Sequence, residues 1–102
     1  MPKQFDHDLN LLKEKLLTMA ATAEQMIRDT TLTLVEWNID LFKPVQTSED
    51  AMDTFQRDID EETVRLIAVH TPVAGDLRLL LMVTRINADL EHIGDHAMDI
   101  GF

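Results

Sequence analysis

The sequence predicts an all-α fold, an antiparallel three-helix bundle that forms a single domain over residues 1–102. Apolar residues recur at intervals of three and four along three long segments, which is the spacing of one helix face. Prolines and hydroxyl residues separate these segments, as they do where helices end and begin. No segment alternates strictly between apolar and polar residues, and 3 Gly and 3 Pro leave little material for the many turns of a β protein.

The first helix is expected to be the longest. Its apolar or small residues recur every three or four positions, a spacing typical of a helix that packs in a bundle. Pro44 is expected to end it, because a proline inside a helix removes a backbone N–H and clashes with the preceding turn. Trp37 and the six Met are expected in the core. The apolar or small positions are Phe5, Leu9, Leu12, Leu16, Met19, Ala23, Met26, Thr30, Leu34, Trp37 and Leu41.

The second helix is expected to begin at Thr47 and Ser48, whose hydroxyls can cap it, and to continue with acids in its first turn. It ends near His70. Thr71 and Pro72 then read as a cap followed by proline at the first position of a third helix. The apolar positions are Met52, Phe55, Ile59, Leu66 and Ile67 in the second helix, and Leu79, Val83, Ile86, Leu90, Ile93, Ala97 and Ile100 in the third.

The composition narrows the class of protein. With 19 acidic against 9 basic residues, the net charge of −10 repels nucleic acid, so the expected partners are cations or basic protein surfaces. The absence of cysteine excludes disulfides and thiolate sites. The longest apolar run, residues 79–83, is too short to span a bilayer, and the first residues lack a signal-peptide pattern. We therefore expect a soluble, cytoplasmic protein.

Three carboxylates on the third helix are the strongest candidate site. Glu91, Asp95 and Asp99 lie four residues apart, and Gly94 separates the first two. Like charges at this spacing repel, and glycine inside a helix costs roughly 1 kcal/mol relative to alanine. A bound cation would reverse the repulsion, and glycine would admit a close neighbour. The alternatives are a solvated acidic face and a plain helix–helix contact at Gly94.

Acids of the second helix can complete such a site, because metal sites in bundles take ligands from facing helices. Asp53 and Asp60 fall on one edge of its apolar face. The predicted ligands are therefore Glu91, Asp95, Asp99, Asp60 and Asp53, and the expected ions are iron or zinc, with manganese or magnesium as alternatives. His92 and His96 lie one turn apart, beside the acids, and are more often incidental at that spacing.

No sequence feature supports catalysis. There is no phosphate-cradling glycine loop and no nucleophile with its base. The Glu-x-x-His motif of carboxylate-bridged redox proteins is absent, since Gly94 stands three positions after Glu91. Two alternatives to a metal-binding regulator remain: a helical oligomerisation or scaffold module whose acids are only solvated, and a carboxylate-bridged metal redox protein.

Residues 65–100, "RLIAVHTPVAGDLRLLLMVTRINADLEHIGDHAMDI", closely resemble the PhoU family. Its repeats carry a Pro-Val-Ala-x-Asp-Leu-Arg turn, matched at residues 72–78, and a Leu-Glu-Arg-Ile-Gly-Asp-x-Ala-x-Asn-Ile helix, matched at residues 90–100. The first helix fits more loosely. The resemblance implies two tandem three-helix bundles with multinuclear metal clusters on Glu/Asp-x-x-x-Asp motifs. It also implies a negative regulator of phosphate uptake and signalling, an adaptor between a phosphate ABC transporter ATPase and a sensor histidine kinase.

Carried over to this chain, the resemblance makes Glu91-x-x-x-Asp95 the motif itself and places Asp99 where asparagine is usual. Gln56-x-x-x-Asp60 aligns with a position that is often Glu-x-x-x-Asp, and Gln56 offers only a neutral carbonyl oxygen. His92 replaces the usual arginine. The chain holds one repeat, and its third helix runs to the last residues without a cap. We therefore expect the bundle to be completed by a missing second repeat or by homo-oligomerisation, as in a homodimer.

Overall fold

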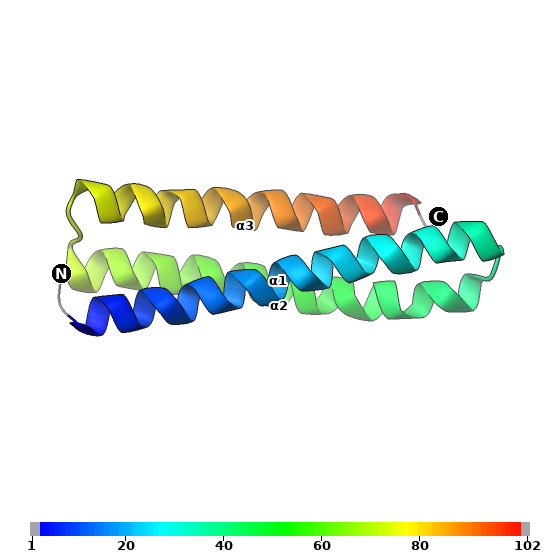
Figure 1. Ribbon diagram of the computed structural model, residues 1–102, viewed down its shortest axis with the longest axis horizontal. Helices are drawn as coiled ribbons and strands as arrows, with labels where there is room; N and C mark the ends of the chain where they lie inside the picture. Colours follow the sequence, from blue (N-terminus) through cyan, green and yellow to red (C-terminus); the bar gives the residue numbers. More distant parts are fainter. Residues whose placement is uncertain (1–2, 101–102) are drawn as a thin grey trace.

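A computed structural model describes residues 3–100 and contains three long helices in an up-down-up bundle (Figure 1). The elements are α1 (Lys3–Glu36), the 3₁₀ helix η1 (Ile39–Phe42), α2 (Lys43–His70) and α3 (Ala74–Ile100). The described residues form no strand, so the predicted fold class is confirmed. The bundle is elongated, with extents of 52 × 18 × 16 Å. Within residues 3–100, no helix combines the length and apolar character that crossing a membrane requires.

The turn between α1 and α2 lies earlier than predicted. Trp37 adopts a left-handed conformation, with φ of 52°, directly after the last residue of α1. The side chain of Asn38 then accepts a hydrogen bond from the backbone N–H of Asp40, over 3.1 Å, and caps η1. Pro44 lies in the first turn of α2 instead of ending α1, because proline lacks only an N–H that the first turn of a helix leaves unpaired. The predicted end of the first helix at Pro44 was wrong.

The other predicted helix starts were also wrong. Thr47 lies inside α2, where its hydroxyl donates to the carbonyl of Lys43 over 3.3 Å and caps nothing. Thr71 ends α2 instead of beginning α3: its φ is 44°, and its N–H donates to the carbonyl of Ile67 over 3.1 Å. A left-handed residue at this position is a common helix terminus. Helix α3 follows at Ala74.

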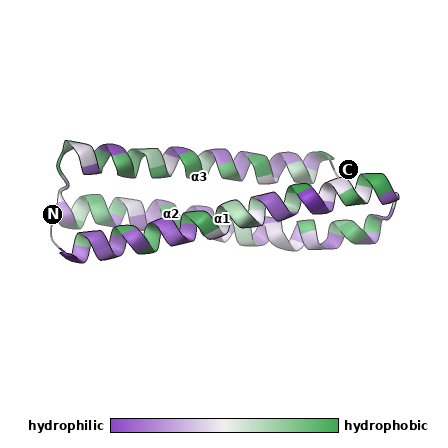
Figure 2. Ribbon diagram, in the orientation of Figure 1, coloured by the Kyte–Doolittle hydropathy of each residue, from purple (hydrophilic) through white to green (hydrophobic). Residues whose placement is uncertain are grey.

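The core lies along the axis where the three helices meet, and the hydropathy colouring in Figure 2 shows that apolar residues recur along each helix. Met19, Met26 and Met52 are fully buried, as predicted. Trp37 is 90% exposed and Met82 is 56% exposed, so their predicted core positions were wrong. Trp37 lies after the end of α1, so the helical spacing no longer places its side chain on the core face. The buried apolar residues are Phe5, Leu9, Leu12, Met19, Ala23, Met26, Phe42, Val45, Met52, Ile59, Leu66, Leu80, Val83 and Ala97.

A polar network fastens the start of α1 to the end of α2. The nearly buried carboxylate of Asp8 accepts hydrogen bonds from Gln4 (2.9 Å) and Arg65 (3.2 Å) and lies 3.4 Å from His70 Nε2. The ring of Phe5 meets His70 edge-on. Burial alone would raise the pKa of Asp8, but these three partners outweigh it and lower the pKa.

Candidate metal centre

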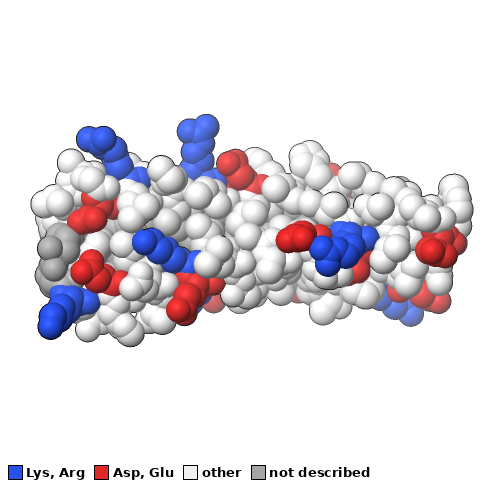
Figure 3. Space-filling model, in the orientation of Figure 1, with Lys and Arg blue, Asp and Glu red and all other residues white. Residues whose placement is uncertain are grey.

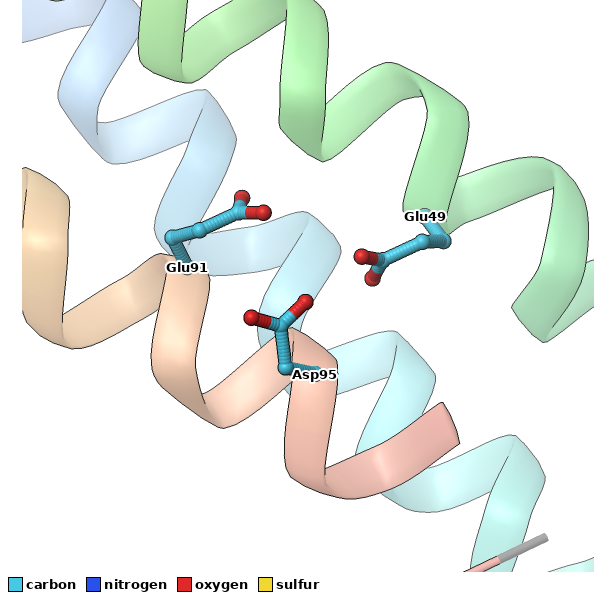
Figure 4. Close-up of side chains that lie close together, drawn as sticks. All are labelled: Glu49, Glu91 and Asp95. Carbon is cyan, nitrogen blue, oxygen red and sulfur yellow. The ribbon is translucent and has the colours of Figure 1, made fainter. Parts of the chain in front are cut away.

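Three carboxylates from two antiparallel helices meet on the α2–α3 side of the bundle. Glu91 and Asp95 lie one turn apart on α3, and Glu49 reaches toward them from α2 (Figure 4). One oxygen of each carboxylate lies within 4.8 Å of one oxygen of each of the others. We call these three residues the carboxylate cluster. Two of them were predicted ligands, and the structure brings them together with a third from the facing helix.

The helical period explains why the cluster is partly buried. Glu91 is only 8% exposed, because it lies on the core face of α3, one turn after buried Asn87 and just before buried Gly94. Glu49 is half-buried and Asp95 is exposed. The cluster therefore runs from the interior to the surface, which leaves an open side from which an ion can enter.

Two oxygens of the cluster have no protein partner. Glu49 Oε2 and Glu91 Oε2 are buried and have no hydrogen-bond partner among the described residues. The same is true of Asn87 Oδ1 beside them. The amide oxygen of Asn87 is an acceptor, and so are the two carboxylate oxygens when they are ionised. A buried acceptor without a donor costs free energy, and native structures rarely leave one unexplained. A cation satisfies such oxygens directly, so the residues present fit a metal ion with oxygen ligands.

The pKa values of the cluster depart from those of ordinary carboxyls. The pKa of Glu49 is raised to about 7, mainly by burial and secondly by the adjoining carboxylate of Asp95. Burial also raises the pKa of Glu91 to about 8, with contributions from Asp53 and Glu49. The metal-free cluster therefore holds protons near neutral pH, and a cation that took their place would release them.

Gly94 leaves the space that Glu49 uses. A Cβ atom added at Gly94 would lie 3.3 Å from Glu49 Oε2 and 3.5 Å from the terminal methyl of Met52. The predicted close contact between helices is thus confirmed at Gly94, and the predicted role of this glycine in admitting a metal ion stays a prediction. Its φ is not positive, so alanine can occupy the position without backbone strain.

The Gly94→Ala variant is expected to bind metal about tenfold more weakly while its metal-free form keeps or gains stability. Alanine favours a helix by roughly 1 kcal/mol over glycine, but its methyl group would lie 3.3 Å from Glu49 Oε2, so that carboxylate must shift by a few tenths of an ångström. Isothermal titration with zinc, one of the expected ions, measures the first effect, and thermal unfolding measures the second. Gly75→Ala is the matched control, because nothing lies within 4 Å of a Cβ there. Equal affinities of both variants would contradict this role for Gly94.

The other predicted ligands lie near the cluster but outside it. Asp53 is exposed and sits beside Glu91, whose pKa it raises. Asp99 is exposed, one turn beyond Asp95, and Asp60 accepts a hydrogen bond of 2.9 Å from Asn87 Nδ2. His92 and His96 are exposed and do not join the cluster.

Glu49 was missed because it was read as an acid in the first turn of the second helix. The available signal was its spacing, since Glu49-x-x-x-Asp53 repeats the pattern of Glu91-x-x-x-Asp95. In an antiparallel helix pair, two such motifs place Glu49 near Asp95 and Asp53 near Glu91. The motif that faces Glu91 and Asp95 thus begins at Glu49, seven residues before Gln56.

Asn87 links the two helices beside the cluster. Its side chain is 1% exposed, and Nδ2 donates to the backbone carbonyl of Gln56 (3.0 Å) as well as to Asp60 (2.9 Å). This fork fixes the position of α3 relative to α2 one turn from Glu91. Asp60 therefore serves as the partner of Asn87 in this structure.

The Asn87→Asp variant is expected to lose about 3 kcal/mol of unfolding free energy, because it buries an unpaired anion against Asp60 and the carbonyl of Gln56. Urea denaturation followed by circular dichroism measures the loss. The exchanged pair, Asn87→Asp with Asp60→Asn, returns one donor and is expected to recover part of it. No recovery in the exchanged pair would show that the Asp60 contact carries little energy.

Comparison with known proteins gives the following similarities. Residues 16–101 match the family described as "PhoU domain". The chain is 35% identical over 98 residues to a phosphate-specific transport system accessory protein PhoU homolog of Pseudomonas putida, covering 96% of this chain and 38% of that protein. It is 34% identical over 94 residues to the phosphate-specific transport system accessory protein PhoU of Escherichia coli (strain K12), covering 92% of this chain and 39% of that protein.

A solved structure is similar as well. The crystal structure of PhoU from Pseudomonas aeruginosa superposes with a TM-score of 0.92 at 33% sequence identity, over 95% of this chain and 46% of that chain. This chain therefore spans less than half the length of these relatives.

Proposed function

Because this chain belongs to the PhoU family, we propose that it is an accessory regulator of phosphate-specific transport that binds metal and acts through protein contacts instead of catalysis. The names of its relatives support the transport role, since they describe accessory proteins of the phosphate-specific transport system. The extent of the match, 96% and 92% of this chain, supports carrying that role over to the domain described here.

One observation carries the metal proposal: Glu49 and Glu91 each have a buried, unpartnered oxygen, and both belong to a group of three carboxylates with ligand atoms within 4.8 Å of one another. Glu49, Glu91 and Asp95 would hold the ion, and Asp53 beside Glu91 is the nearest further carboxylate that we propose as a ligand. Iron or zinc is the proposed ion, with manganese or magnesium as alternatives: Asp and Glu oxygens ligate zinc, and a set of oxygen ligands also suits manganese and magnesium. Bound metal would supply the positive charge that keeps these carboxyls ionised and α2 joined to α3.

The proposed mode of action is contact between proteins. In this proposal the bundle binds the ATPase of a phosphate ABC transporter and a sensor histidine kinase in the cytoplasm, and keeps the phosphate response off when phosphate is plentiful. The elongated shape supports it, since three helices of this length offer long surfaces on several sides. A deletion that left phosphate-responsive expression unchanged would refute this mode of action.

Elemental analysis of protein purified without chelator tests the metal proposal. We expect stoichiometric metal in the unmodified protein and at least a tenfold lower content in the Glu91→Gln/Asp95→Asn variant, because both changes keep the shape and remove the charge. The matched control is Asp58→Asn/Glu61→Gln, which alters two exposed acids outside the cluster. It is expected to retain the metal.

The pattern of results separates the alternatives. An equal loss of metal in the control variant would show that surface charge in general, and not the carboxylate cluster, binds the ion. Protein without metal in every form would favour the scaffold module whose acids are only solvated. Dioxygen consumption by protein loaded with ferrous iron would favour the carboxylate-bridged redox protein.

A further inference from the structure

Three large apolar side chains meet at the turn after α1, where the bundle leaves them uncovered. Trp37 is 90% exposed, Ile39 is 58% exposed, and Leu34 in the last turn of α1 is 48% exposed. All three line one hollow of ≈ 170 Å³, together with Thr33 and Asn38. We call Leu34, Trp37 and Ile39 the Trp37 corner. Because these residues share a hollow, they form one apolar surface instead of isolated exposed residues.

The backbone at the corner disfavours the side chain that it carries. Trp37 has a φ of 52°, in the left-handed region that glycine adopts without steric cost and other residues do not. Thr71 ends α2 with a similar backbone, but its side chain is small and polar. At Trp37 a large apolar side chain occupies such a position and adds little to the core. Strained residues of this kind cluster at functional sites.

The Trp37 corner combines a projecting anchor with an adjoining hollow. Tryptophan is enriched among the residues that carry most of the binding energy of protein interfaces, since its ring fills a pocket and its N–H can donate a hydrogen bond. The hollow is several times larger than the ~30 Å³ that a water molecule takes in the liquid. It can therefore receive an apolar side chain in return. A folded protein surface with the opposite relief fits this arrangement.

The charges around the corner favour a basic partner. Glu36 and Asp40 flank it, and both are exposed. Lys43, the base closest to them in the sequence, pairs with Asp40 over 3.6 Å, which leaves Glu36 without an ion-pair partner among the described residues. Figure 3 shows acidic side chains at the end of the molecule where Figure 1 places the turn after α1. Lysine or arginine on a partner complements these acids, whereas an anionic lipid surface is repelled by them.

We propose that the Trp37 corner docks on another protein, at an apolar pocket rimmed by lysine or arginine. Trp37 fills the pocket, the hollow beside it receives an apolar side chain of the partner, and Glu36 pairs with the basic rim. The inference rests on the proposed function in one respect, since that function indicates which protein carries the pocket: a subunit of the phosphate-specific transporter.

Binding to nanodiscs tests the docking site. The probes are phosphatidylcholine nanodiscs that hold the phosphate-specific transporter of the same organism, and the same nanodiscs without it. We expect the unmodified protein to bind only the former, and Trp37→Gly to bind them more weakly by about tenfold or more. Leu17→Ala is the matched control, because Leu17 is 71% exposed on α1 outside the corner, and its affinity is expected to stay unchanged.

Glycine at position 37 also separates a docking role from a structural one. Because glycine adopts a positive φ freely, Trp37→Gly is expected to keep or raise its melting temperature while it loses binding. Thermal unfolding followed by circular dichroism measures the first effect. A lower melting temperature together with weaker binding would show that the indole supports the fold, and would overturn the proposal.

Charge reversal tests the basic rim. Glu36→Lys is expected to weaken binding to the transporter by about threefold or more at low salt, with a smaller difference at high salt, where exposed charges are screened. Glu61→Lys, at an exposed acid of α2, is the control and should bind like the unmodified protein. Equal affinities of the two variants would overturn the proposed pairing of Glu36.

The remaining outcomes each have a separate meaning. Equal binding of Trp37→Gly and the unmodified protein to the transporter would overturn the docking site and leave the proposed function standing. Equal binding of the unmodified protein to empty nanodiscs would show that the corner meets lipid instead of protein, and would also overturn the proposal. No binding of the unmodified protein to either nanodisc would contradict the proposed contact with the transport system, and this docking site with it.

Discussion

Metal-free protein is expected to become less stable as the pH rises from about 5 to about 9, by about 3 kcal/mol of unfolding free energy. Glu49 and Glu91 have folded-state pKa values raised to about 7 and about 8, from model values of 4.5. The folded state therefore binds more protons than the unfolded state across this window. Its stabilising protons are fully present below about pH 4.5 and are lost as the pH passes through 7 and 8.

Thermal unfolding by circular dichroism, with chelator present throughout, measures this effect. For a domain of this size 3 kcal/mol corresponds to a melting temperature lower by about 10 °C or more at about pH 9. Glu91→Gln carries no titratable proton at that position and is expected to show a much flatter pH dependence. A steep decline that persists in Glu91→Gln would assign the effect to other groups.

The acid side should show the opposite trend from a different residue. Asp8 has a lowered pKa, so the stability it contributes is present above its unfolded pKa and is lost as the pH falls through its folded value. Metal-free protein should therefore be most stable in mildly acidic solution, at a pH above the folded-state pKa of Asp8 and below the folded-state pKa values of Glu49 and Glu91. This places the stability maximum below neutrality, where the carboxylate cluster still holds its protons.

Metal is expected to raise the melting temperature strongly at about pH 8, where the metal-free cluster has lost much of the stability that its protons provide. At a free concentration of about 100 times the dissociation constant, a single bound ion adds about 2.7 kcal/mol, or about 10 °C and more for a domain of this length. Glu91→Gln/Asp95→Asn is expected to show almost no shift, because it retains only one charged carboxylate of the cluster, that of Glu49.

Differential scanning calorimetry with and without each candidate ion measures these shifts and ranks the ions. Asp58→Asn/Glu61→Gln again serves as the control and should respond like the unmodified protein. An equal upward shift in the cluster variant would show that the ion stabilises the fold from another place. Stabilisation by none of the four ions would count against a metal site at the cluster.

The sequence was sufficient to predict the fold and two of the three residues of the carboxylate cluster, because both predictions rest on the spacing of residues along a single helix. Residues such as Leu12, Ile59 and Val83 recur at helical spacing and occupy the core. Glu91 and Asp95 were identifiable because their repulsion and the nearby Gly94 are unfavourable in a plain helix. These are properties of a single helix, so they can be identified from the sequence without knowing how the helices pack.

The features that were missed depend on contacts between segments. Glu49 joins the cluster because α2 packs antiparallel to α3 in a register that places Glu49 beside Asp95. Asp60 was predicted as a ligand, and its hydrogen bond with Asn87 depends on the register of α2 against α3. The end of α1 was misplaced because Trp37 continues the apolar spacing by chance, although the backbone has already left the helix.

The exposed Trp37 also decides how this protein can be observed. It is the only tryptophan, and the chain has no tyrosine, so nearly all near-ultraviolet absorption and intrinsic emission come from one indole at the corner after α1. Because that indole is 90% exposed in the folded chain, its surroundings change little on unfolding. Its fluorescence is a weak signal of denaturation but a direct signal of anything that covers the corner.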